Sequence, residues 1–556
     1  MTDPLNPLIV QSDLTVLLEV ASPKADDARA ELARFAELEK APEHVHTYRV
    51  NPLSLWNAAV AGLSAGDVAL ALHTYAKYPV PPSVLTEIHD QMGRYGRLRI
   101  VRDFDSGGLA LTSAEPALIV EVARDRLVGA LLGERLDGNR YAVRLGDRGA
   151  LKQALLRLGW PAADEAGYAE GSPLEGVEVT CELRGYQADA VAAWWADGSD
   201  IGGNGVLVLP CGAGKTIIGI AALAATAHHT LIVATNITAA RQWIRELLEK
   251  TTLTSDLVGE YSGNRKDIRP ITVATYQVLT WSPPNTPDDA PLEQRYPHLG
   301  LFDAQEWGLV IYDEVHLLPA PVFRATARIQ AVRRLGLTAT LVREDGKEAD
   351  VFSLIGPKRF DVPWKELEAQ GWIAPATCTE VRVEMSEERR MQYALADPQQ
   401  RYRIAATAPQ KLWVLAKLLA EHADDRVLVI GQFVEQIKEV AQRFNAPLIT
   451  GQTAQRTREE RYEAFRSGEC KLLIVSKVAN FSIDRPKANV LVQLSGTFGS
   501  RQEEAQRLGR VMRPKADGGQ AHFYSVVTRD SVDQTFALNR QRFLAEQGYS
   551  YDIVDA

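Results

Sequence analysis

Eight consecutive residues, Leu209 to Thr216, restrict the fold of this chain more than any other segment, because they read Leu-Pro-Cys-Gly-Ala-Gly-Lys-Thr. One apolar run, Gly205 to Leu209, precedes the glycines and another, Ile217 to Ala225, follows them. This order predicts a strand, a glycine loop and a helix, with loop N–H groups directed at phosphates. Lys215 would reach the β- and γ-phosphates, and the Thr216 hydroxyl would bind Mg²⁺. The predicted nucleotide-binding residues of the loop are Pro210, Cys211, Gly212, Ala213, Gly214, Lys215 and Thr216. Leu209 occupies a position where a first glycine is common, so a chance glycine-rich turn is the alternative.

Length and composition exclude several protein classes. A chain of 556 residues predicts three to five domains of about 100–200 residues each. The formal net charge of −9 argues against a protein that coats nucleic acid nonspecifically. It does not exclude a protein that binds a phosphate backbone through local basic patches. No apolar stretch reaches the ~18 residues of a membrane span, and the N-terminus, Met1 to Pro4, lacks the basic and apolar regions expected of a secretory signal. Four cysteines without a CxxC pair predict free thiols in the cytoplasm and no iron–sulfur cluster.

The first third of the chain predicts two small domains. Residues 1–112 contain helical apolar spacing at Leu53–Ala61, Ala65–Lys77 and Ser83–Tyr95, followed by strand-like Leu98–Val101 and Gly108–Thr112. Three helices and a hairpin favour a winged-helix-like module, and a plain helical packing domain is the alternative. Residues 113–172 predict a small mixed α/β unit that ends in a Gly/Ala/acidic linker at 162–173.

From residue 175 onward, apolar runs alternate with helical stretches. Continuous apolar runs are typical of parallel strands that are covered on both faces. With right-handed crossovers, the blocks 175–360 and 411–556 each predict a doubly wound parallel sheet, so the fold class is α/β. Residues 378–410 differ, because arginines and tyrosines interleave there on a helix-prone stretch. The predicted strands are Val206–Leu209, Leu231–Ala234, Ile271–Ala274, Leu309–Ile311, Val427–Ile430, Leu472–Val475, Val490–Leu494 and Phe523–Val527.

An acidic pair ends the apolar run Val310-Ile311-Tyr312-Asp313-Glu314-Val315-His316. At the carboxyl end of a strand beside the phosphate-loop strand, Asp313 can hold Mg²⁺, and Glu314 can orient or deprotonate the attacking water. The alternative is an exposed acidic turn.

A basic helix is predicted at Ala505 to Arg513. Its arginines recur at three-residue spacing, so they share one side of the helix. We expect Arg510 and Arg513 to act as arginine fingers on the γ-phosphate from the second sheet domain. A solvated helix face is the alternative.

Weaker strings stand around these motifs. Leu183 to Gln187 precedes the phosphate loop, and Gln187 can read an adenine edge; Gly336 to Thr340 ends a strand where hydroxyls can link nucleotide and neighbouring domain. Arg184, Gln187 and Gln506 complete the predicted nucleotide-binding set.

The order of these motifs resembles the superfamily 2 helicases and translocases, and more closely the xeroderma pigmentosum group B (XPB) helicase family. The matching strings are Leu209–Thr216, Asp313–His316, Gly336–Lys347 and Gly499–Arg513. The run Asn539 to Ala545 is also similar. The resemblance covers about residues 175–556 and is weaker in the front third, and the Leu209 departure is typical of the family.

The resemblance implies two RecA-like domains in a bacterial, ATP- and Mg²⁺-dependent DNA helicase that moves 3′ to 5′ in DNA repair. It implies that Arg343, Glu344 and Asp345 form the family's unwinding loop, and that the insert near 384–407 is a thumb-like DNA-contacting motif. Residues 113–172 would correspond to a damage-recognition-like domain. The implied partners are single-stranded, forked and duplex DNA, with a repair nuclease or transcription and repair proteins as candidate protein partners.

DNA contacts are predicted at strand-end loops and in the Arg/Tyr-rich insert. Tyr276 and Trp281 fit a core or a surface position equally well, and Gln242-Trp243 is interpreted as packing. Two other functions fit: a duplex translocase that never separates strands, and a nucleotide-gated scaffold. The predicted DNA-contacting residues are Thr235, Asn236, Thr275, Tyr276, Arg343, Glu344, Asp345, Arg401, Arg403 and Arg501.

Overall fold

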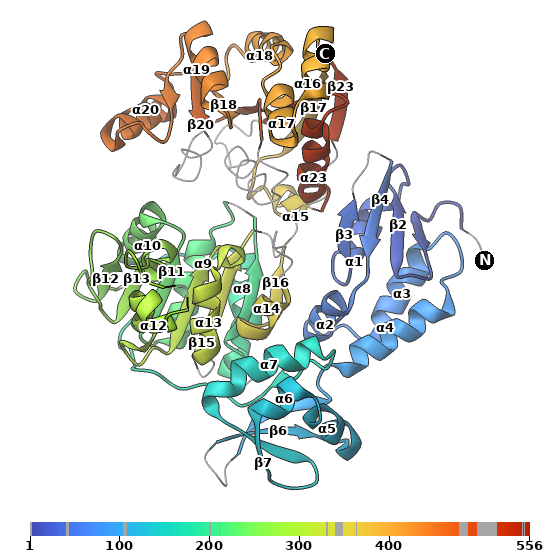
Figure 1. The fold of residues 1–556 in the computed structure, drawn as a ribbon, viewed down its shortest axis with the longest axis vertical. Helices are drawn as coiled ribbons and strands as arrows, with labels where there is room; N and C mark the ends of the chain where they lie inside the picture. Colours follow the sequence, from blue (N-terminus) through green and yellow to red (C-terminus); the bar gives the residue numbers. More distant parts are fainter. Residues whose placement is uncertain are drawn as a thin grey trace.

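The computed structural model describes residues 3–556, except 41–43, 104–107, 200–201, 211, 288, 330–331, 340–347, 363, 477–487, 497–519, 547–548 and 550. The described chain forms four parts: an N-terminal domain, a small α/β domain, and two larger domains that we call lobe 1 and lobe 2 (Figure 1). Each lobe contains a seven-stranded sheet.

The N-terminal domain combines an antiparallel sheet with helices. Its sheet has the order β1-β2-β4-β3 and was not predicted, whereas the three predicted helices are confirmed. Two of the helices have capping boxes, from Asn51 and Ser64, which satisfy N–H groups of the first turn. The elements are β1 (Leu8–Val10), β2 (Thr15–Glu19), α1 (Ala25–Leu32), β3 (Glu37–Lys40), β4 (Val45–Arg49), α2 (Pro52–Val60), α3 (Ala65–Tyr75) and α4 (Pro82–Arg94).

The small α/β domain begins earlier than predicted. The hairpin strands assigned to residues 1–112 pair with later strands in the order β7-β8-β6-β5-β9, so the predicted boundary at 112 falls inside one unit. Sheet partners distant in sequence decide this boundary, and local patterns do not report them. The elements are β5 (Leu98–Arg102), β6 (Leu109–Ser113), α5 (Pro116–Ala123), α6 (Arg126–Leu131), β7 (Leu132–Arg135), β8 (Arg140–Val143), η1 (Leu145–Asp147), α7 (Arg148–Arg157) and β9 (Ala163–Asp164).

Lobe 1 is a parallel sheet in the order β12-β13-β11-β14-β15-β10-β16, as the fold class predicted. Successive strand residues point to opposite faces, so Leu207 joins the core under α8, α9 and α10 while Val206 joins the core on the other face. The first elements are α8 (Gly185–Trp195), η2 (Ala196–Gly198), β10 (Asn204–Val208), α9 (Lys215–Thr226), β11 (Thr230–Ala234), α10 (Ile237–Lys250), β12 (Val258–Tyr261), β13 (Ile271–Thr275) and α11 (Tyr276–Leu279). Then follow α12 (Leu292–Arg295), η3 (Pro297–Asp303), β14 (Leu309–Asp313), η4 (Val315–Leu317), α13 (Ala320–Arg328), β15 (Arg333–Thr338), α14 (Glu348–Leu354), β16 (Lys358–Asp361) and α15 (Trp364–Ala369).

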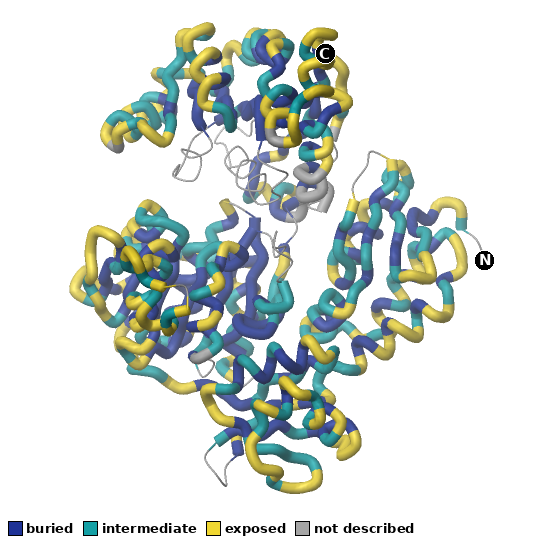
Figure 2. The backbone as a smooth tube through the Cα atoms, in the orientation of Figure 1, coloured by how far each residue is buried: buried dark blue, intermediate teal, exposed yellow. Residues whose placement is uncertain are grey.

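Lobe 2 repeats the parallel sheet in the order β19-β20-β18-β21-β22-β17-β23. The strand β17 (Ala376–Val383) belongs to this sheet, so the predicted insert at 378–410 reduces to the hairpin of α16 (Glu387–Leu395) and α17 (Pro398–Ala406). The remaining elements are α18 (Gln410–Glu421), β18 (Val427–Gly431), α19 (Val434–Arg443), β19 (Leu448–Ile449), α20 (Gln455–Ser467), β20 (Leu472–Ser476), β21 (Val490–Gln493), β22 (Ala521–Thr528), α23 (Val532–Glu546) and β23 (Tyr551–Asp555). The central strands of both lobes are buried along their length (Figure 2).

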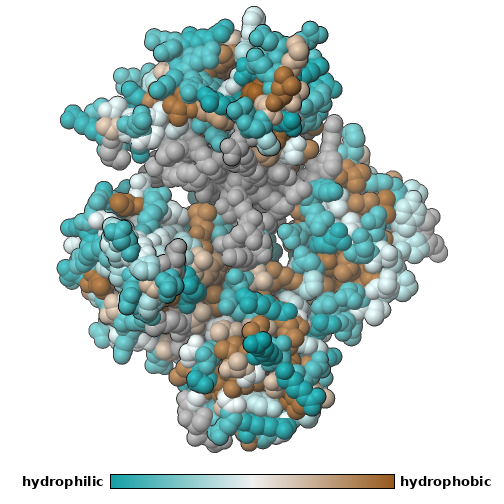
Figure 3. All heavy atoms as spheres, in the orientation of Figure 1, coloured by the Kyte–Doolittle hydropathy of each residue, from teal (hydrophilic) through white to brown (hydrophobic). Residues whose placement is uncertain are grey.

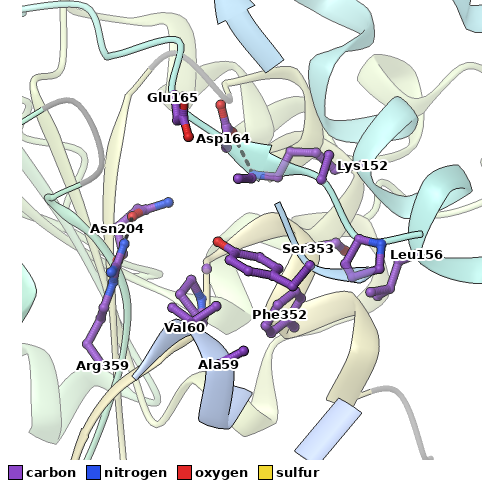
Figure 4. Close-up of a pocket in the computed structure, with 16 residues that line it drawn as sticks. Ala59, Val60, Lys152, Leu156, Asp164, Glu165, Asn204, Phe352, Ser353 and Arg359 are labelled. Carbon is purple, nitrogen blue, oxygen red and sulfur yellow. Dashed lines mark hydrogen bonds and ion pairs between the residues drawn. The ribbon is translucent and has the colours of Figure 1, made fainter. Parts of the chain in front are cut away.

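The N-terminal parts are attached to lobe 1. A cavity of about 220 Å³ marks the place where α2, α7 and β9 meet β10, α14 and β16 (Figure 4). The Lys358 backbone N–H donates to Asn57 Oδ1 at 3.1 Å, and Gln153 Nε2 donates to Asp350 Oδ1 at 2.9 Å. The 162–173 segment is packed rather than free, because Ser172 N donates to Glu306 O at 2.8 Å.

The face in Figure 3 is mostly hydrophilic over both lobes. In the described ranges, no single helix has the length and apolar character of a membrane span. The pair α2 and α3 passes that test only together, with a bend of 113° between them.

Candidate nucleotide site and groove of lobe 1

The phosphate loop lies between β10 and α9, as predicted. Gly214 caps α9 with φ +80°, a conformation that L side chains rarely adopt. A Cβ at Gly214 would also lie 2.6 Å from Gln187 Nε2. The Ala213 carbonyl accepts hydrogen bonds from the Tyr186 hydroxyl at 2.8 Å and from Gln187 Nε2 at 2.9 Å. Two side chains of helix α8 therefore hold the phosphate loop in place through the Ala213 carbonyl.

Lys215 and the acidic pair meet at one edge of the sheet. Lys215 Nζ lies 3.3 Å from Glu314 Oε1 and 3.5 Å from the Leu209 carbonyl oxygen. The strand order differs from the prediction, because β15 lies between β10 and β14 and pairs with both. The end of β15 at Thr338 consequently separates the phosphate loop from Asp313. Sequence order along the chain does not determine which strands are neighbours.

Glu314 stands in an unusual conformation, with φ +49°. Such strain in a non-glycine residue is typical of functional sites. Within the described chain, its Oε2 is buried and accepts no hydrogen bond. A buried carboxylate oxygen of this kind suits a bound water or ligand group.

The two carboxylates have opposite pKa shifts. Burial, and then the neighbouring Glu314, raise the pKa of Asp313 to about 6, against the hydrogen bond from Trp243 and the charge of Lys215. Burial alone would raise the pKa of Glu314, but Lys215 and His316 outweigh it and hold that pKa below its ordinary value. Glu314 is therefore the carboxylate that Lys215 keeps ionised.

His316 connects the acidic pair to β15. His316 Nδ1 lies 2.6 Å from the Thr338 hydroxyl and 3.6 Å from Glu314 Oε2. The predicted link through the Gly336–Thr340 string thus involves Thr338, and Thr340 lies outside the described residues.

Arg184 and Gln187 form the first turn of α8. Gln187 is 4% exposed and accepts the Arg184 N–H at 3.0 Å, so its amide binds backbone groups. The Arg184 guanidinium lies over the Trp372 ring, 4.4 Å from the centroid. Trp372 follows α15 in the segment that connects the two lobes, and no sequence motif marks it.

An open groove of about 630 Å³ lies at the outer edge of lobe 1, lined by the strand-end loops that were predicted to contact DNA. Asn236 caps α10 by accepting the Ala239 N–H at 3.0 Å, and Thr275 caps α11. The lining residues are Asn236, Ile237, Thr238, Gly263, Lys266, Thr275, Gln277, Val278, Trp281 and His298. Thr235 lies beside this groove, and its carbonyl oxygen accepts from Gln277 Nε2.

The two aromatic residues of this region have different positions. Tyr276 is 5% exposed and its hydroxyl donates to the Asp313 carbonyl at 3.0 Å, so its ring is a core aromatic and the prediction of a surface contact is wrong for that ring. Trp281 is 48% exposed and lies 5.7 Å from the His298 ring, which Tyr261 holds by a hydrogen bond of 2.8 Å. Tyr276 packs in the core cluster that contains Leu279 and Tyr312, whereas Trp281 lies outside that cluster.

Arginines of the insert hold the α16–α17 hairpin together. Arg401 Nε donates to the Ala396 carbonyl at 3.0 Å, Arg403 pairs with Glu435, and Arg389 Nε donates to the Ile404 carbonyl at 3.0 Å. Arg401 and Arg403 are nevertheless exposed. The predicted residues Cys211, Arg343, Glu344, Asp345, Arg501, Gln506, Arg510 and Arg513 lie outside the described residues.

Trp243 was interpreted as packing, yet its indole Nε1 donates to Asp313 Oδ2 at 3.1 Å. No sequence signal distinguishes this tryptophan from a core residue of an amphipathic helix.

Two parallel sheets in tandem, with a phosphate loop at one strand end and an acidic pair at another, define a nucleotide-driven motor of two RecA-like lobes. Comparison with known proteins agrees with this class. The family model of the ERCC3/RAD25/XPB C-terminal helicase matches residues 367–556, and the type III restriction enzyme res subunit model matches 180–343. A helicase conserved C-terminal domain model matches residues 8–137.

Similar proteins cover the whole chain. The DNA 3′-5′ helicase XPB of Mycobacterium tuberculosis is 56% identical over 100% of this chain and 98% of its own length. The protein of the same name from Kineococcus radiotolerans is 56% identical over 100% and 97%. The general transcription and DNA repair factor IIH helicase/translocase subunit XPB of Antonospora locustae is 32% identical over 99% and 82%. The chain belongs to the XPB family of helicases, as the sequence motifs predicted.

Proposed function

We propose that this protein is an ATP-dependent DNA helicase that moves 3′ to 5′ and acts in DNA repair. The observation that carries the proposal is the juxtaposition of Lys215 Nζ and Glu314 Oε1, 3.3 Å apart at the phosphate loop. The 56% identity to proteins named DNA 3′-5′ helicase XPB supports the substrate and the polarity. A repair nuclease and transcription or repair proteins stay predicted partners.

Four residues of lobe 1 carry the proposed hydrolysis. Lys215 binds the β- and γ-phosphates, and Glu314 orients the attacking water through its buried Oε2. Asp313 and the Thr216 hydroxyl would hold Mg²⁺, and a carboxylate with a hydroxyl fits the oxygen ligands that this ion prefers. When bound, Mg²⁺ neutralises charge on the phosphates. Arg184 and Gln187, which the sequence predicts to bind nucleotide, lie next to the loop.

The second lobe completes the proposed site. Arg510 and Arg513, with Gln506, would approach the γ-phosphate when the lobes close, so hydrolysis depends on closure. Arg343, Glu344 and Asp345 would act at the point of strand separation. These roles rest on the sequence motifs.

A DNA strand is proposed to follow the groove of lobe 1. The N-terminus of α10 suits phosphates, and the exposed Trp281 ring suits an unpaired base. Lys266, 4.9 Å from the Tyr261 ring centroid, adds positive charge there. The insert arginines Arg401 and Arg403 are proposed as further backbone contacts.

The ATPase rate of the full chain, measured without nucleic acid and with single-stranded, duplex and forked DNA and RNA, tests the proposal. We expect DNA to stimulate the rate, and forked DNA with a 3′ tail to be unwound. Lys215→Ala should lower turnover by about 10²–10³-fold, because it removes a positive charge from the transferring phosphate. Lys417→Ala, an exposed lysine on α18, is the control.

The other outcomes assign other functions. Stimulated hydrolysis without strand separation would indicate a duplex translocase. An ATPase rate that stays near zero when DNA is added would indicate a nucleotide-gated scaffold. Full ATPase activity of the Lys215 variant would refute the proposed nucleotide site.

A further inference from the structure

Trp243 lies between helix α9, which carries Lys215, and Asp313 at the end of β14. It is 2% exposed on α10, and its indole N–H donates to Asp313 Oδ2 at 3.1 Å. The Tyr276 hydroxyl donates to the backbone carbonyl of the same Asp313 at 3.0 Å. The indole N–H is the one donor of that ring, and it holds one oxygen of the Asp313 carboxylate.

The indole also rests on the helix that carries Lys215 and Thr216. A Cβ added at Gly219 of α9 would lie 2.4 Å from Cη2 and 3.1 Å from Cζ3 of Trp243. Glycine inside a helix costs about 1 kcal/mol relative to alanine. The close approach of the Trp243 ring accounts for a glycine at this position.

One side chain therefore touches both elements whose separation defines the proposed magnesium site. The ring packs against α9 and so sets the distance between α9 and the end of β14. The N–H sets the orientation of the Asp313 carboxylate there. We propose that Trp243 is a positioning residue, which holds the Asp313 carboxylate in the orientation that binds Mg²⁺ with the nucleotide. This inference rests on the proposed function, because it takes Asp313 as the magnesium ligand.

Trp194 provides a matched comparison for a packing role. It is 0% exposed in the same core, and its Nε1 donates to the backbone carbonyl of Arg334 at 3.2 Å. Replacing either tryptophan by phenylalanine removes one buried N–H and the same number of buried ring atoms. Only the Trp243 replacement frees a carboxylate of the proposed site.

The experiment uses full-length Trp243→Phe and Trp194→Phe and measures equilibrium binding of a fluorescent N-methylanthraniloyl-ADP while Mg²⁺ is titrated. We expect Trp243→Phe to raise the Mg²⁺ concentration at half-saturation about tenfold or more, the effect of losing a hydrogen bond to a charged group. Trp194→Phe should leave that concentration unchanged. The thermal midpoint without nucleotide or metal should fall by a similar amount in both variants.

Gly219→Ala is the second variant, because it displaces the ring and keeps the N–H. It should shift the Mg²⁺ requirement in the same direction, and it serves if Trp243→Phe fails to fold. A lowered thermal midpoint with wild-type Mg²⁺ dependence in the folded variants would overturn the inference and leave Trp243 a packing residue. Asp313→Asn separates the two proposals: unchanged Mg²⁺-dependent binding in that variant would contradict the proposed function itself.

Discussion

At the residue scale, one buried carboxylate compensates several buried cations. Asp164 Oδ1 lies 2.6 Å from Arg148 Nη2. The other oxygen, Asp164 Oδ2, lies 2.9 Å from Lys152 Nζ (Figure 4). Arg334 of lobe 1 is 0% exposed and stands over the Tyr168 ring at 5.6 Å. Burial alone would raise the pKa of Asp164, but Lys152 and Arg148 outweigh it and hold that pKa far below its ordinary 3.8. The charge of Asp164 also acts on Arg334, so it links the small α/β domain electrostatically to lobe 1.

Asp164→Asn should destabilise the chain by about 3–5 kcal/mol, because it leaves buried cations without their counter-charge. Urea unfolding at pH 7 measures the change. Asp137→Asn is the control, since that exposed carboxylate pairs with Arg140 at 2.6 Å in water and should change the free energy of unfolding far less.

The same substitution predicts a pH dependence. The folded pKa of Asp164 is depressed, so its stabilisation is complete above pH 3.8 and is lost as the pH falls below that value. The stability difference between wild type and variant should shrink in that acid range. An equal effect of the two substitutions at pH 7 would contradict the role given to Asp164.

At the element scale, short helices at strand ends organise both the nucleotide site and the groove. Helix α10 begins in the groove at its Asn236 cap. About two turns further along α10, Trp243 donates its indole N–H to Asp313. The helix α11 starts at the Thr275 cap and contributes Tyr276 to the same aspartate. A strand bound in the groove would thus contact the elements that hold the acidic pair.

Trp281→Ala should weaken binding of single-stranded DNA by about 1–3 kcal/mol, because it removes a stacking surface for one base. Fluorescence anisotropy with a labelled oligonucleotide measures the affinity. Trp413→Ala removes a tryptophan that is 74% exposed on α18 of lobe 2 and should leave the affinity unchanged. Equal affinities of the Trp281 variant and wild type would exclude the stacking role.

At the scale of the whole molecule, the N-terminal parts contact lobe 1, and α15 leads from lobe 1 to lobe 2. One apolar cluster continues from Leu207 through Trp364 and Leu367 to Leu428, so the two lobes share a core around this connection. The Tyr549 hydroxyl donates to Glu368 Oε2 at 2.6 Å and adds a polar link. Helix α23 of lobe 2 also contacts β3 of the N-terminal domain, so closure of lobe 2 on nucleotide would change that contact.

Arg510→Ala should retain ATP binding and lower hydrolysis by about 10³–10⁵-fold, because the proposed finger acts only on the transferring phosphate. Equilibrium binding of an ATP analogue and steady-state turnover separate the two effects. Arg529→Ala, an exposed arginine that pairs with Asp555 at 3.5 Å, is the control. Wild-type turnover of the Arg510 variant would reject the finger.

Much of the motor could be predicted because its signals are local. A glycine loop between two apolar runs requires a strand and a helix on either side, and each of the eight predicted strands overlaps an observed one. The helices at 53–95 followed in the same way from apolar spacing. The sheet at residues 8–49 escaped prediction, because its strands have three to five residues and Glu37–Lys40 is mostly charged.

The sequence by itself determined the phosphate loop, the acidic pair, the two parallel sheets and the family, since each depends on residue types at short spacing. The tertiary structure alone decided that β15 separates the loop from Asp313, that β5 and β6 join the small domain, and that Trp243 binds Asp313. These three facts depend on which distant segments become neighbours. Packing of the whole chain sets those neighbours, and no local pattern reports them.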